Sequence, residues 1–218
     1  MGMGDARQII AKRAALEVKD GMIVNLGIGI PSMVPNYLGK DMRVFFQAEN
    51  GILGMGPTPK ENADGNLSNA AGLPVTILPG ASYFDSAIAF GMIRRGCIDL
   101  SILGALQVNA KGDLANWIVP GKRVPGVGGA MELAYGAKNL IAVMNHCDKD
   151  GQPKIVTECS LPVTTYHCVK KIITEMAVFS IVDQQLYLDE LMPGCTLADV
   201  KNNTEADFSF STNFKAHD

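Results

Sequence analysis

Apolar and polar positions along the chain follow two patterns that alternate with one another. Short, continuous apolar runs are typical of strands buried on both faces, whereas segments with apolar residues three or four positions apart indicate amphipathic helices. The first segment of the second kind covers residues 5–19, where Ile9, Ile10 and Ala14 share one face, and it ends at Asp20-Gly21. The first predicted element is therefore a helix.

Applied along the whole chain, the two patterns predict a succession of strands and helices. The expected strands lie at residues 22–26, 44–46, 75–78, 98–103, 140–144, 155–156, 178–182 and 186–188. The expected helices lie at residues 5–19, 85–95, 130–136, 168–176 and 197–201, with a short helix around residues 33–37. The strand at 98–103 can continue beyond Gly104 through Leu106 and Val108, and residues 209–218 are expected to be frayed.

Strands that alternate with helices favour an α/β fold, with an open, mostly parallel sheet and helices on both of its faces. From about Lys154 onward the elements become shorter, so the C-terminal portion is expected to be mixed. The sequence contains no internal repeat, no linker and no low-complexity segment, and its 218 residues suit one domain. We therefore expect a single domain over residues 1–218.

Composition and charge exclude several classes of protein. With 47% hydrophobic and 19% charged residues, the chain is globular rather than disordered. Its net charge is −3, and its basic clusters do not exceed pairs such as Arg94-Arg95, which argues against nucleic-acid binding. No apolar run is long enough for a membrane span and no secretory signal is present, so we expect a cytoplasmic protein with no membrane contact.

The cysteine and histidine residues give no sign of a metal site. The five cysteines are scattered and form no Cys-x-x-Cys pair, which is the pattern of free thiols in a reducing compartment. The three histidines, His146, His167 and His217, are far apart and form no His-x-x-His pair, so we expect them in the core or on the surface. We expect no bound metal.

One carboxylate is notable for its position in the pattern. The segment 43–57, RVFFQAENGILGMGP, passes from an apolar run of strand composition into Asn50-Gly51 and then into further glycines. Glu49 therefore lies where a predicted strand gives way to a glycine-rich loop, and the carboxyl ends of strands are where open α/β sheets bind ligands. Composition alone favours a solvated charge beside a hairpin turn. Apolar neighbours on both sides favour a buried, reactive carboxylate, because burying an unused charge is costly.

Two other glycine-rich loops adjoin predicted elements. After the strand at 22–26 the chain reads Gly27-Ile28-Gly29-Ile30-Pro31, which matches a dinucleotide-binding fingerprint only weakly because the third glycine is missing. We expect Gly27 and Gly29 to bring the backbone close to a ligand or to a neighbouring strand, rather than to bind NAD.

The run Pro125-Gly126-Val127-Gly128-Gly129 precedes the helix predicted from Ala130. Glycine amides can face a ligand at close range and a helix N-terminus adds partial positive charge, so this loop can stabilise an oxyanion. A plain turn before a helix explains the run equally well. A carboxylate such as Glu49 is a weak nucleophile that needs an activated acyl donor such as a thioester, and its attack creates an oxyanion of this kind.

Several stretches together resemble the β subunit of class I (3-oxoacid) coenzyme A transferases. The sequence around Glu49, FQAENGILG, resembles the Ser/Ala-Glu-Asn-Gly active-site motif of that family. NLGIGIP at 25–31, LPGASYFDS at 78–86, GDLANWIVPGK at 112–122 and VGGAMEL at 127–133 agree with the family in order and spacing. The similarity extends from about Arg7 to Phe208, and it implies a Rossmann-like CoA-transferase fold.

The resemblance implies that Glu49 is a nucleophile in ping-pong chemistry. The acyl group of an acyl-CoA would pass to Glu49 as a mixed anhydride, and CoA would then attack the Glu49 carbonyl to give a glutamyl-CoA thioester. Backbone amides of Gly128 and Gly129 would form part of the oxyanion hole. The residues implied to contact substrate or coenzyme A are Gly27, Gly29, Asn50, Gly51 and Gly126. Coenzyme A would be a substrate, so no bound cofactor is expected.

The resemblance also implies a partner and a substrate class. The chain would work with an α subunit in an α2β2 heterotetramer, and a glutamine of that α subunit would be the second oxyanion donor. The substrates would be acyl-CoA and a short-chain 3-oxoacid such as acetoacetate, with acetate, butyrate or succinyl-CoA. Two alternatives stay open, namely the same chemistry on 3-oxoadipate and a non-transferase domain of the same fold that senses a ligand or isomerises a sugar phosphate.

Some side chains near the motifs have two interpretations each. Gln47 and Asn50 flank Glu49 and can orient it. Alternatively, Asn50 only satisfies the turn. Arg123 either contacts substrate or a CoA phosphate or faces solvent, and solvent is the favoured interpretation because a single exposed charge contributes little. Met55, Tyr83 and Trp117 either line an acyl pocket or fill the core, with the core as the default. Ala48 stands where many relatives have serine, and the motif allows either residue at this position.

Overall fold

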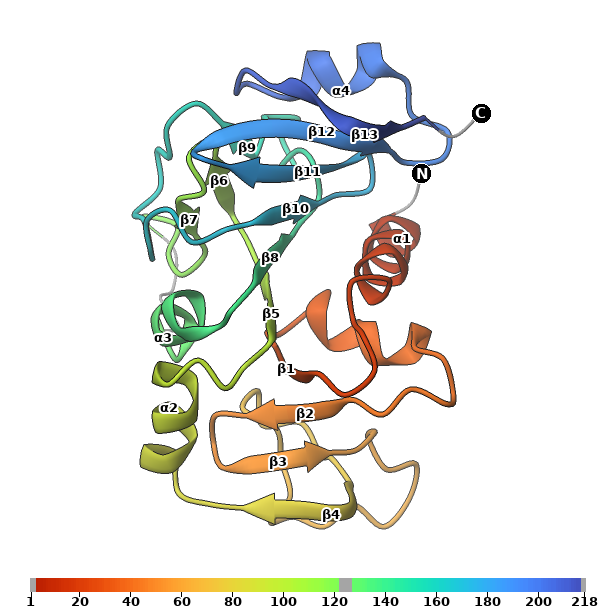
Figure 1. Ribbon diagram of the computed structural model, residues 1–218, viewed down its shortest axis with the longest axis vertical. Coiled ribbons are helices and arrows are strands. Elements are labelled where there is room, and N and C mark those ends of the chain that lie inside the picture. The colour runs from red at the N-terminus through yellow and green to blue at the C-terminus, as the bar shows by residue number, and fades with distance from the viewer. Residues whose placement is uncertain (1–2, 122–126, 217–218) are drawn as a thin grey trace.

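The computed structural model describes residues 3–121 and 127–216, which form one ten-stranded sheet with helices on either side (Figure 1). The helices are α1 (Met3–Ala15), the 3-10 helix η1 (Pro31–Tyr37), α2 (Ser86–Arg94), α3 (Ala130–Gly136) and α4 (Leu197–Asn203). The strands of the large sheet are β1 (Ile23–Leu26), β2 (Phe45–Ala48), β3 (Ile52–Met55), β4 (Ile77–Tyr83), β5 (Leu100–Gly104), β8 (Leu140–Val143), β10 (Lys171–Ile173), β11 (Ala177–Val182), β12 (Gln185–Leu191) and β13 (Ser209–Lys215). A smaller sheet joins β6 (Gln107–Asn109), β7 (Leu114–Ala115) and β9 (Ile155–Val156).

The large sheet has a parallel centre, and antiparallel pairing joins further strands to it on both sides, with β13 parallel to β12 at one edge. Its order is β13-β12-β11-β10-β8-β5-β1-β2-β3-β4. Strands β10, β8, β5, β1 and β2 are parallel to one another, whereas β11 and β12 on one flank and β3 and β4 on the other are joined by antiparallel pairing. The expected α/β class, the largely parallel sheet and the mixed C-terminal portion are confirmed. The antiparallel pairing of β3 and β4 at one edge was not expected from the sequence. It arises because the Asn50-Gly51 turn makes a hairpin of β2 and β3.

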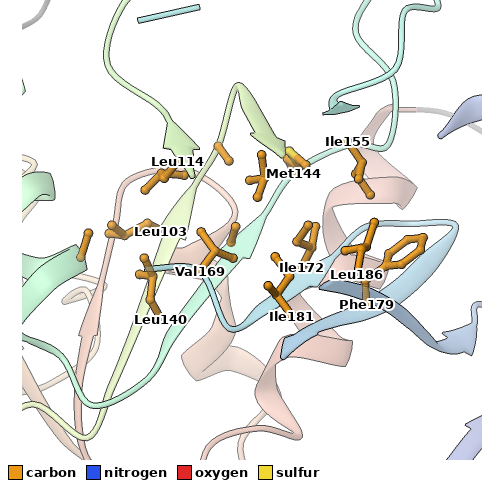
Figure 2. Close-up of a cluster of buried hydrophobic side chains, with 14 of the residues drawn as sticks. Leu103, Leu114, Leu140, Met144, Ile155, Val169, Ile172, Phe179, Ile181 and Leu186 are labelled. Carbon is orange, nitrogen blue, oxygen red and sulfur yellow. The ribbon is translucent and has the colours of Figure 1, made fainter. Parts of the chain in front are cut away.

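Neighbouring residues of the central strands face two different cores. On β5, Ile102 packs in the cluster that contains residues of α1 and η1, and Leu103 packs in the cluster that contains residues of α2 and α3. Figure 1 shows α1 on one side of the sheet and α2 and α3 on the other. Figure 2 shows how Leu103, Leu140 and Phe179 gather in the second cluster. Because both faces are covered, the strands have continuous apolar runs, as expected for a parallel sheet.

The helix expected at residues 168–176 is wrong, because this segment contains β10. Its Ile172 and Ile173 face opposite cores, and the strand pairs in parallel with β8 and antiparallel with β11. A short apolar stretch that is buried on both sides has no period-two pattern, so its sequence does not distinguish a strand from a buried helix.

Two expectations about the sheet edges are also wrong. The strand expected at 75–78 is β4, which begins later and continues through Pro79 and Gly80 to Tyr83. Proline is tolerated there because β4 is an edge strand, where a missing N–H need not break a ladder. The segment expected to be frayed contains β13, the opposite edge strand, which pairs in parallel with β12. Residues 217–218 lie outside the described residues.

The remaining expected elements are found where they were expected, most of them with shifted ends. The first helix ends at Ala15 instead of Lys19, and the extension through Leu106 and Val108 belongs to the separate strand β6. Asp85 caps α2, since its carboxylate accepts from the Ile88 N–H at 2.9 Å. None of the helices in residues 3–121 and 127–216 has the length and apolar character needed to cross a bilayer.

Candidate functional site

The carboxyl ends of three adjacent parallel strands open onto one cavity. In the order β5-β1-β2, the strands are followed by Ala105, Gly27 and Glu49 respectively. All three residues line a cavity of about 2080 Å³, together with Gly128 and Gly129 from the segment before α3. The sheet therefore places the glycine loops and the predicted nucleophile around a common space, as open α/β sheets do with ligand sites.

Glu49 lies half-buried in the wall of this cavity. Its Oε2 accepts from Nδ2 of Asn25 at 3.3 Å. Its Oε1 points toward Gly129, since a Cβ atom placed on Gly129 would lie 3.2 Å from that oxygen. Glu49 is thus neither a freely solvated loop charge nor a fully buried one. Its two oxygens face two different neighbours, one on β1 and one before α3.

The turn after Glu49 is held by two adjacent residues. Gly51 has φ of 120°, and any side chain there would overlap the carbonyl oxygen of Phe84. The Asn50 carboxamide donates to the carbonyl of Ser68 at 2.8 Å, so it fastens the turn to the following loop. Neither Asn50 nor Gly51 is among the described residues that line the cavity. Their predicted contact with substrate stays a prediction.

Gly128 and Gly129 lie next to the cavity at the start of α3. Among the described residues, no protein acceptor takes the N–H of either glycine. Gly129 is near Glu49 and Phe90 of α2, and a Cβ atom on Gly128 would meet nothing within 4 Å in the described part of the chain. Two amides beside a carboxylate can stabilise an oxyanion that forms between them. Gly126 and Arg123, which the sequence also pointed to, lie outside the described residues.

The loop after β1 follows the neighbouring strand closely. A Cβ atom on Gly27 would lie 3.3 Å from the Leu103 side chain and 3.4 Å from the Ile102 carbonyl oxygen on β5. Gly29 has φ of 90°, a region that favours glycine, and its neighbour Ser32 donates to its carbonyl at 2.7 Å. The expected close approach to a strand is confirmed for Gly27. Both glycines also line the cavity.

Sequence reasoning missed Asn25, which contacts Glu49 directly. Asn25 and Gln47 are in register on β1 and β2, and each is 1% exposed. Nδ2 of Asn25 donates to Oε1 of Gln47 at 2.7 Å. Gln47 is therefore linked to Glu49 through Asn25. A polar residue within an otherwise apolar strand, directly before a glycine loop, was the available signal.

Other residues around the cavity differ in character. Met55 and Trp117 line it, whereas Tyr83 is 57% exposed and is not among the described lining residues. Lys154 also lines it and donates to the Ala105 carbonyl at 3.0 Å. Burial lowers the pKa of Lys154 to about 8. The cavity wall therefore includes an ammonium group bound to a carbonyl at the end of β5.

The histidines and cysteines of the described residues form no candidate metal site. His146 is fully buried, and burial lowers its pKa to about 4. His167 is half-exposed, and His217 lies outside the described residues. All five cysteines are free thiols. Within residues 3–121 and 127–216, His, Cys, Asp and Glu side chains form no group of three or more suited to a metal ion.

Comparison with known proteins gives consistent matches over almost the whole chain. Residues 7–203 match the family model described as coenzyme A transferase. The chain is 57% identical to the β subunit of a probable coenzyme A transferase of Bacillus subtilis, over 98% of this chain and 100% of the relative. It is 51% identical to the β subunit of an acetate CoA-transferase of Escherichia coli, over 94% of both chains. It is 50% identical to one subunit of a probable succinyl-CoA:3-ketoacid coenzyme A transferase of Bacillus subtilis, over 96% of this chain and 97% of the relative.

A solved structure gives the same fold. The apoenzyme of an acyl-CoA transferase from Escherichia coli O157:H7 superimposes with a TM-score of 0.79 at 22% identity. The match covers 98% of this chain but only 43% of that one. At this identity the likeness concerns the fold alone.

Proposed function

The chain belongs to the coenzyme A transferase family, and from this premise we propose that it is the β subunit of a short-chain 3-oxoacid CoA transferase with Glu49 as its nucleophile. One observation carries the proposal. The Glu49 carboxylate lies at the carboxyl end of β2 and next to Gly129, and both residues line the same cavity. A nucleophile beside backbone amides that can receive an oxyanion is the arrangement that acyl transfer requires.

In the first step, Oε1 of Glu49 attacks the thioester carbonyl of the acyl-CoA. The tetrahedral intermediate carries an oxyanion on the former acyl carbonyl oxygen, which the amides of Gly128 and Gly129 stabilise. A glutamine of the α subunit supplies a further donor in this proposal. Collapse expels the CoA thiolate and leaves the acyl group joined to Glu49 as a mixed anhydride.

In the second step, the CoA thiolate attacks Cδ of Glu49. The bond from Cδ to the anhydride oxygen breaks, the original acid leaves as a carboxylate, and Glu49 becomes a glutamyl-CoA thioester. An incoming carboxylate reverses both steps and leaves as the new acyl-CoA, so the kinetics are ping-pong. Binding energy from the non-reacting parts of CoA helps to drive the reacting steps.

The proposed substrates are acetoacetate and an acyl-CoA derived from acetate, butyrate or succinate. Relatives at about 50% identity bear the names acetate CoA-transferase and succinyl-CoA:3-ketoacid coenzyme A transferase, which supports this class. Relatives that match the chain over most of their length are named β subunits, which supports a partner α subunit. We propose in addition that the two kinds of chain form an α2β2 heterotetramer and that the enzyme acts in the cytoplasm.

Trapping of the enzyme intermediate tests the proposal. The chain is co-expressed with its α subunit, the purified complex is incubated with acetoacetyl-CoA, and borohydride is added to reduce any thioester. We expect loss of activity and a mass change confined to the peptide that contains Glu49. A complex treated with borohydride but no acyl-CoA is the control and should keep its activity.

The same complex distinguishes the alternatives. Transfer to acetoacetate faster than to 3-oxoadipate supports the proposed substrate, and the reverse preference replaces it with 3-oxoadipate. A complex that stays unmodified at Glu49 and acts on a sugar phosphate would refute the transferase proposal. A mass other than that of two α and two β chains would refute the proposed stoichiometry.

A further inference from the structure

Three polar side chains form a row across the buried centre of the sheet. Ser101 on β5, Asn25 on β1 and Gln47 on β2 are in register, and their exposed fractions are 0%, 1% and 1%. The rest of these strands is largely apolar. Burying polar groups costs free energy unless hydrogen bonds compensate, so a polar row in this position needs an explanation.

The Asn25 carboxamide is oriented by its surroundings. Nδ2 lies 2.7 Å from Oε1 of Gln47, 3.1 Å from the backbone carbonyl of Gln47 and 3.3 Å from Oε2 of Glu49. The backbone carbonyl and the carboxylate can only accept, so the amide nitrogen must face them. Two N–H groups thus serve three acceptors, and the longest of the three contacts is the one to Glu49.

The row is incompletely satisfied beside Glu49. Within the described part of the chain, Oδ1 of Asn25, Nε2 of Gln47 and Oγ of Ser101 are buried and have no hydrogen-bond partner. Leaving a buried polar atom unpaired costs roughly 1–3 kcal/mol. The row is therefore not arranged for stability alone, and the one Asn25 contact that reaches a reactive group is the contact to Oε2 of Glu49.

The proposed reaction has tetrahedral intermediates at two different carbon atoms. When Glu49 attacks the thioester, charge develops on the oxygen of the acyl group, near Gly128 and Gly129. When the thiolate attacks Cδ of Glu49, charge develops on the oxygen of Glu49 that is not part of the anhydride. With Oε1 toward Gly129 and bonded to the acyl group, that oxygen is Oε2, which faces Asn25.

We propose that Asn25 is a catalytic residue that donates a hydrogen bond to Oε2 of Glu49 while the glutamyl-CoA thioester forms and breaks. The inference rests on the proposed function, because it requires Glu49 to become a thioester. As the thiolate bonds to Cδ, the Cδ–Oε2 double bond becomes a single bond and the negative charge moves to Oε2. The 3.3 Å contact between Asn25 and Glu49 shortens as this charge develops. Catalytic hydrogen bonds are often long in an unliganded active site and tighten in the reacting complex. Collapse restores the double bond and releases the acid.

The test compares single-turnover and steady-state rates of three complexes, namely wild type, Asn25→Ala and Ser101→Ala. Intact mass spectrometry after mixing with acetoacetyl-CoA gives the rate of glutamyl-CoA formation. We expect N25A to slow it by roughly a hundredfold to a thousandfold, the usual cost of losing one oxyanion donor. Ser101 shares the burial and the register of Asn25, but its hydroxyl bonds to none of the described residues, so S101A should form the thioester at the wild-type rate.

A second readout separates catalysis from structure. In N25A the anhydride still forms and releases thiolate, but its conversion to thioester is slow, so water attacks the anhydride instead. The ratio of CoA thiol released by hydrolysis to CoA transferred should therefore rise in N25A. A purely structural role would lower both rates together and leave the ratio unchanged.

The outcomes identify which idea has failed. Wild-type rates and ratio in N25A, or an unchanged ratio with both rates reduced, would overturn the role of Asn25. If the wild-type complex forms no glutamyl-CoA, the proposed function itself is wrong. Should N25A not fold, Asn25→Leu provides the test instead, since leucine has the same branching at Cγ and lacks the donor.

Discussion

At the scale of single residues, two adjacent glycines are required for different physical reasons. Gly128 has φ of 55°, a left-handed conformation, but a Cβ there would meet no atom of the described residues within 4 Å. Gly129 has φ of −82°, which any residue can adopt, yet a Cβ there would lie 3.2 Å from Oε1 of Glu49 and 3.3 Å from the Phe90 ring. One glycine is needed for backbone conformation and the other for space beside the carboxylate.

Alanine at these two positions should therefore affect different properties. Gly129→Ala displaces Glu49 and should lower kcat by about tenfold to a hundredfold, because small misplacements of a nucleophile are costly. Gly128→Ala should lower the free energy of unfolding by about 1 kcal/mol and affect kcat less. Transferase assays and urea unfolding of both variants check this. A greater loss of kcat in G128A than in G129A would contradict it.

The length of the Glu49 side chain is a second requirement at a single residue. Glu49→Ala should abolish transfer, and Glu49→Asp should leave little, because the shorter side chain moves the reacting oxygen by about 1 Å or more. Circular dichroism should match the wild type, since the Gly51 turn and the hairpin do not depend on the carboxylate. Turnover close to wild type in either variant, measured as acetoacetyl-CoA consumption, would refute the role of Glu49.

At the scale of elements, the sequence predicted best those elements that have one face exposed to solvent. Helix α2 has its Asp85 cap and an exposed face, and α3 was predicted with its observed bounds. Strand β10 was mistaken for a helix because burial on both faces removes its alternation. Strands β4 and β13 are edges, and no local pattern could reveal how they pair with their neighbours in the sheet.

His146 connects the segment after β8 to α4 through a buried polar contact. Its ring nitrogens lie 2.9 Å from the hydroxyl oxygens of Thr174 and Thr204, the latter at the end of α4. Burial, and secondarily the positive charge of Lys154, lower the pKa of His146 to about 4, from an ordinary value of 6.5. The folded protein therefore disfavours the protonated ring.

The lowered pKa makes stability depend on pH in a defined direction. Below the unfolded pKa of 6.5, the unfolded chain binds a proton at His146 that the folded protein does not bind. The stabilisation of the folded protein by neutral His146 is therefore complete above pH 6.5 and is lost as the pH falls toward 4. The full loss is about 3 kcal/mol. Urea unfolding between pH 7 and 4 should show a shallower decline for His146→Asn than for the wild type. Parallel curves would refute the effect.

At the scale of the whole molecule, the active-site motif was readable from the sequence but its surroundings were not. Glu49 and Gly129 lie far apart along the chain. Oxyanion chemistry made their pairing one possibility at the level of sequence, and only the resemblance to a known family implied it. The contact between Asn25 and Glu49 could not be predicted from the sequence, because it depends on the register of β1 against β2. Register is a property of the assembled sheet, which sequence patterns specify only indirectly.

A network of charges joins the first helix to the far half of the sheet. Glu17, just after α1, accepts from Arg13 at 2.8 Å and from Lys171 of β10 at 2.8 Å, and Arg13 donates to Glu190 of β12 at 2.9 Å. These side chains are only 12–26% exposed. Burial alone raises the pKa of Glu17, but the hydrogen bonds from Lys171 and Arg13 outweigh it, so the pKa falls below its usual 4.5.

Removal of this carboxylate should loosen α1 from the C-terminal strands. Glu17→Gln leaves two partly buried cations without this carboxylate and should lower the free energy of unfolding by roughly 1–3 kcal/mol at pH 7. The exposed pair Lys149–Asp150 is the control, and Lys149→Ala should change stability by less than about 0.5 kcal/mol. Because the Glu17 pKa is lowered, its contribution is present above pH 4.5 and is lost at lower pH. The difference between wild type and E17Q should therefore narrow in urea unfolding as the pH falls below 4.5, and a constant difference would show that packing, not charge, holds α1 in place.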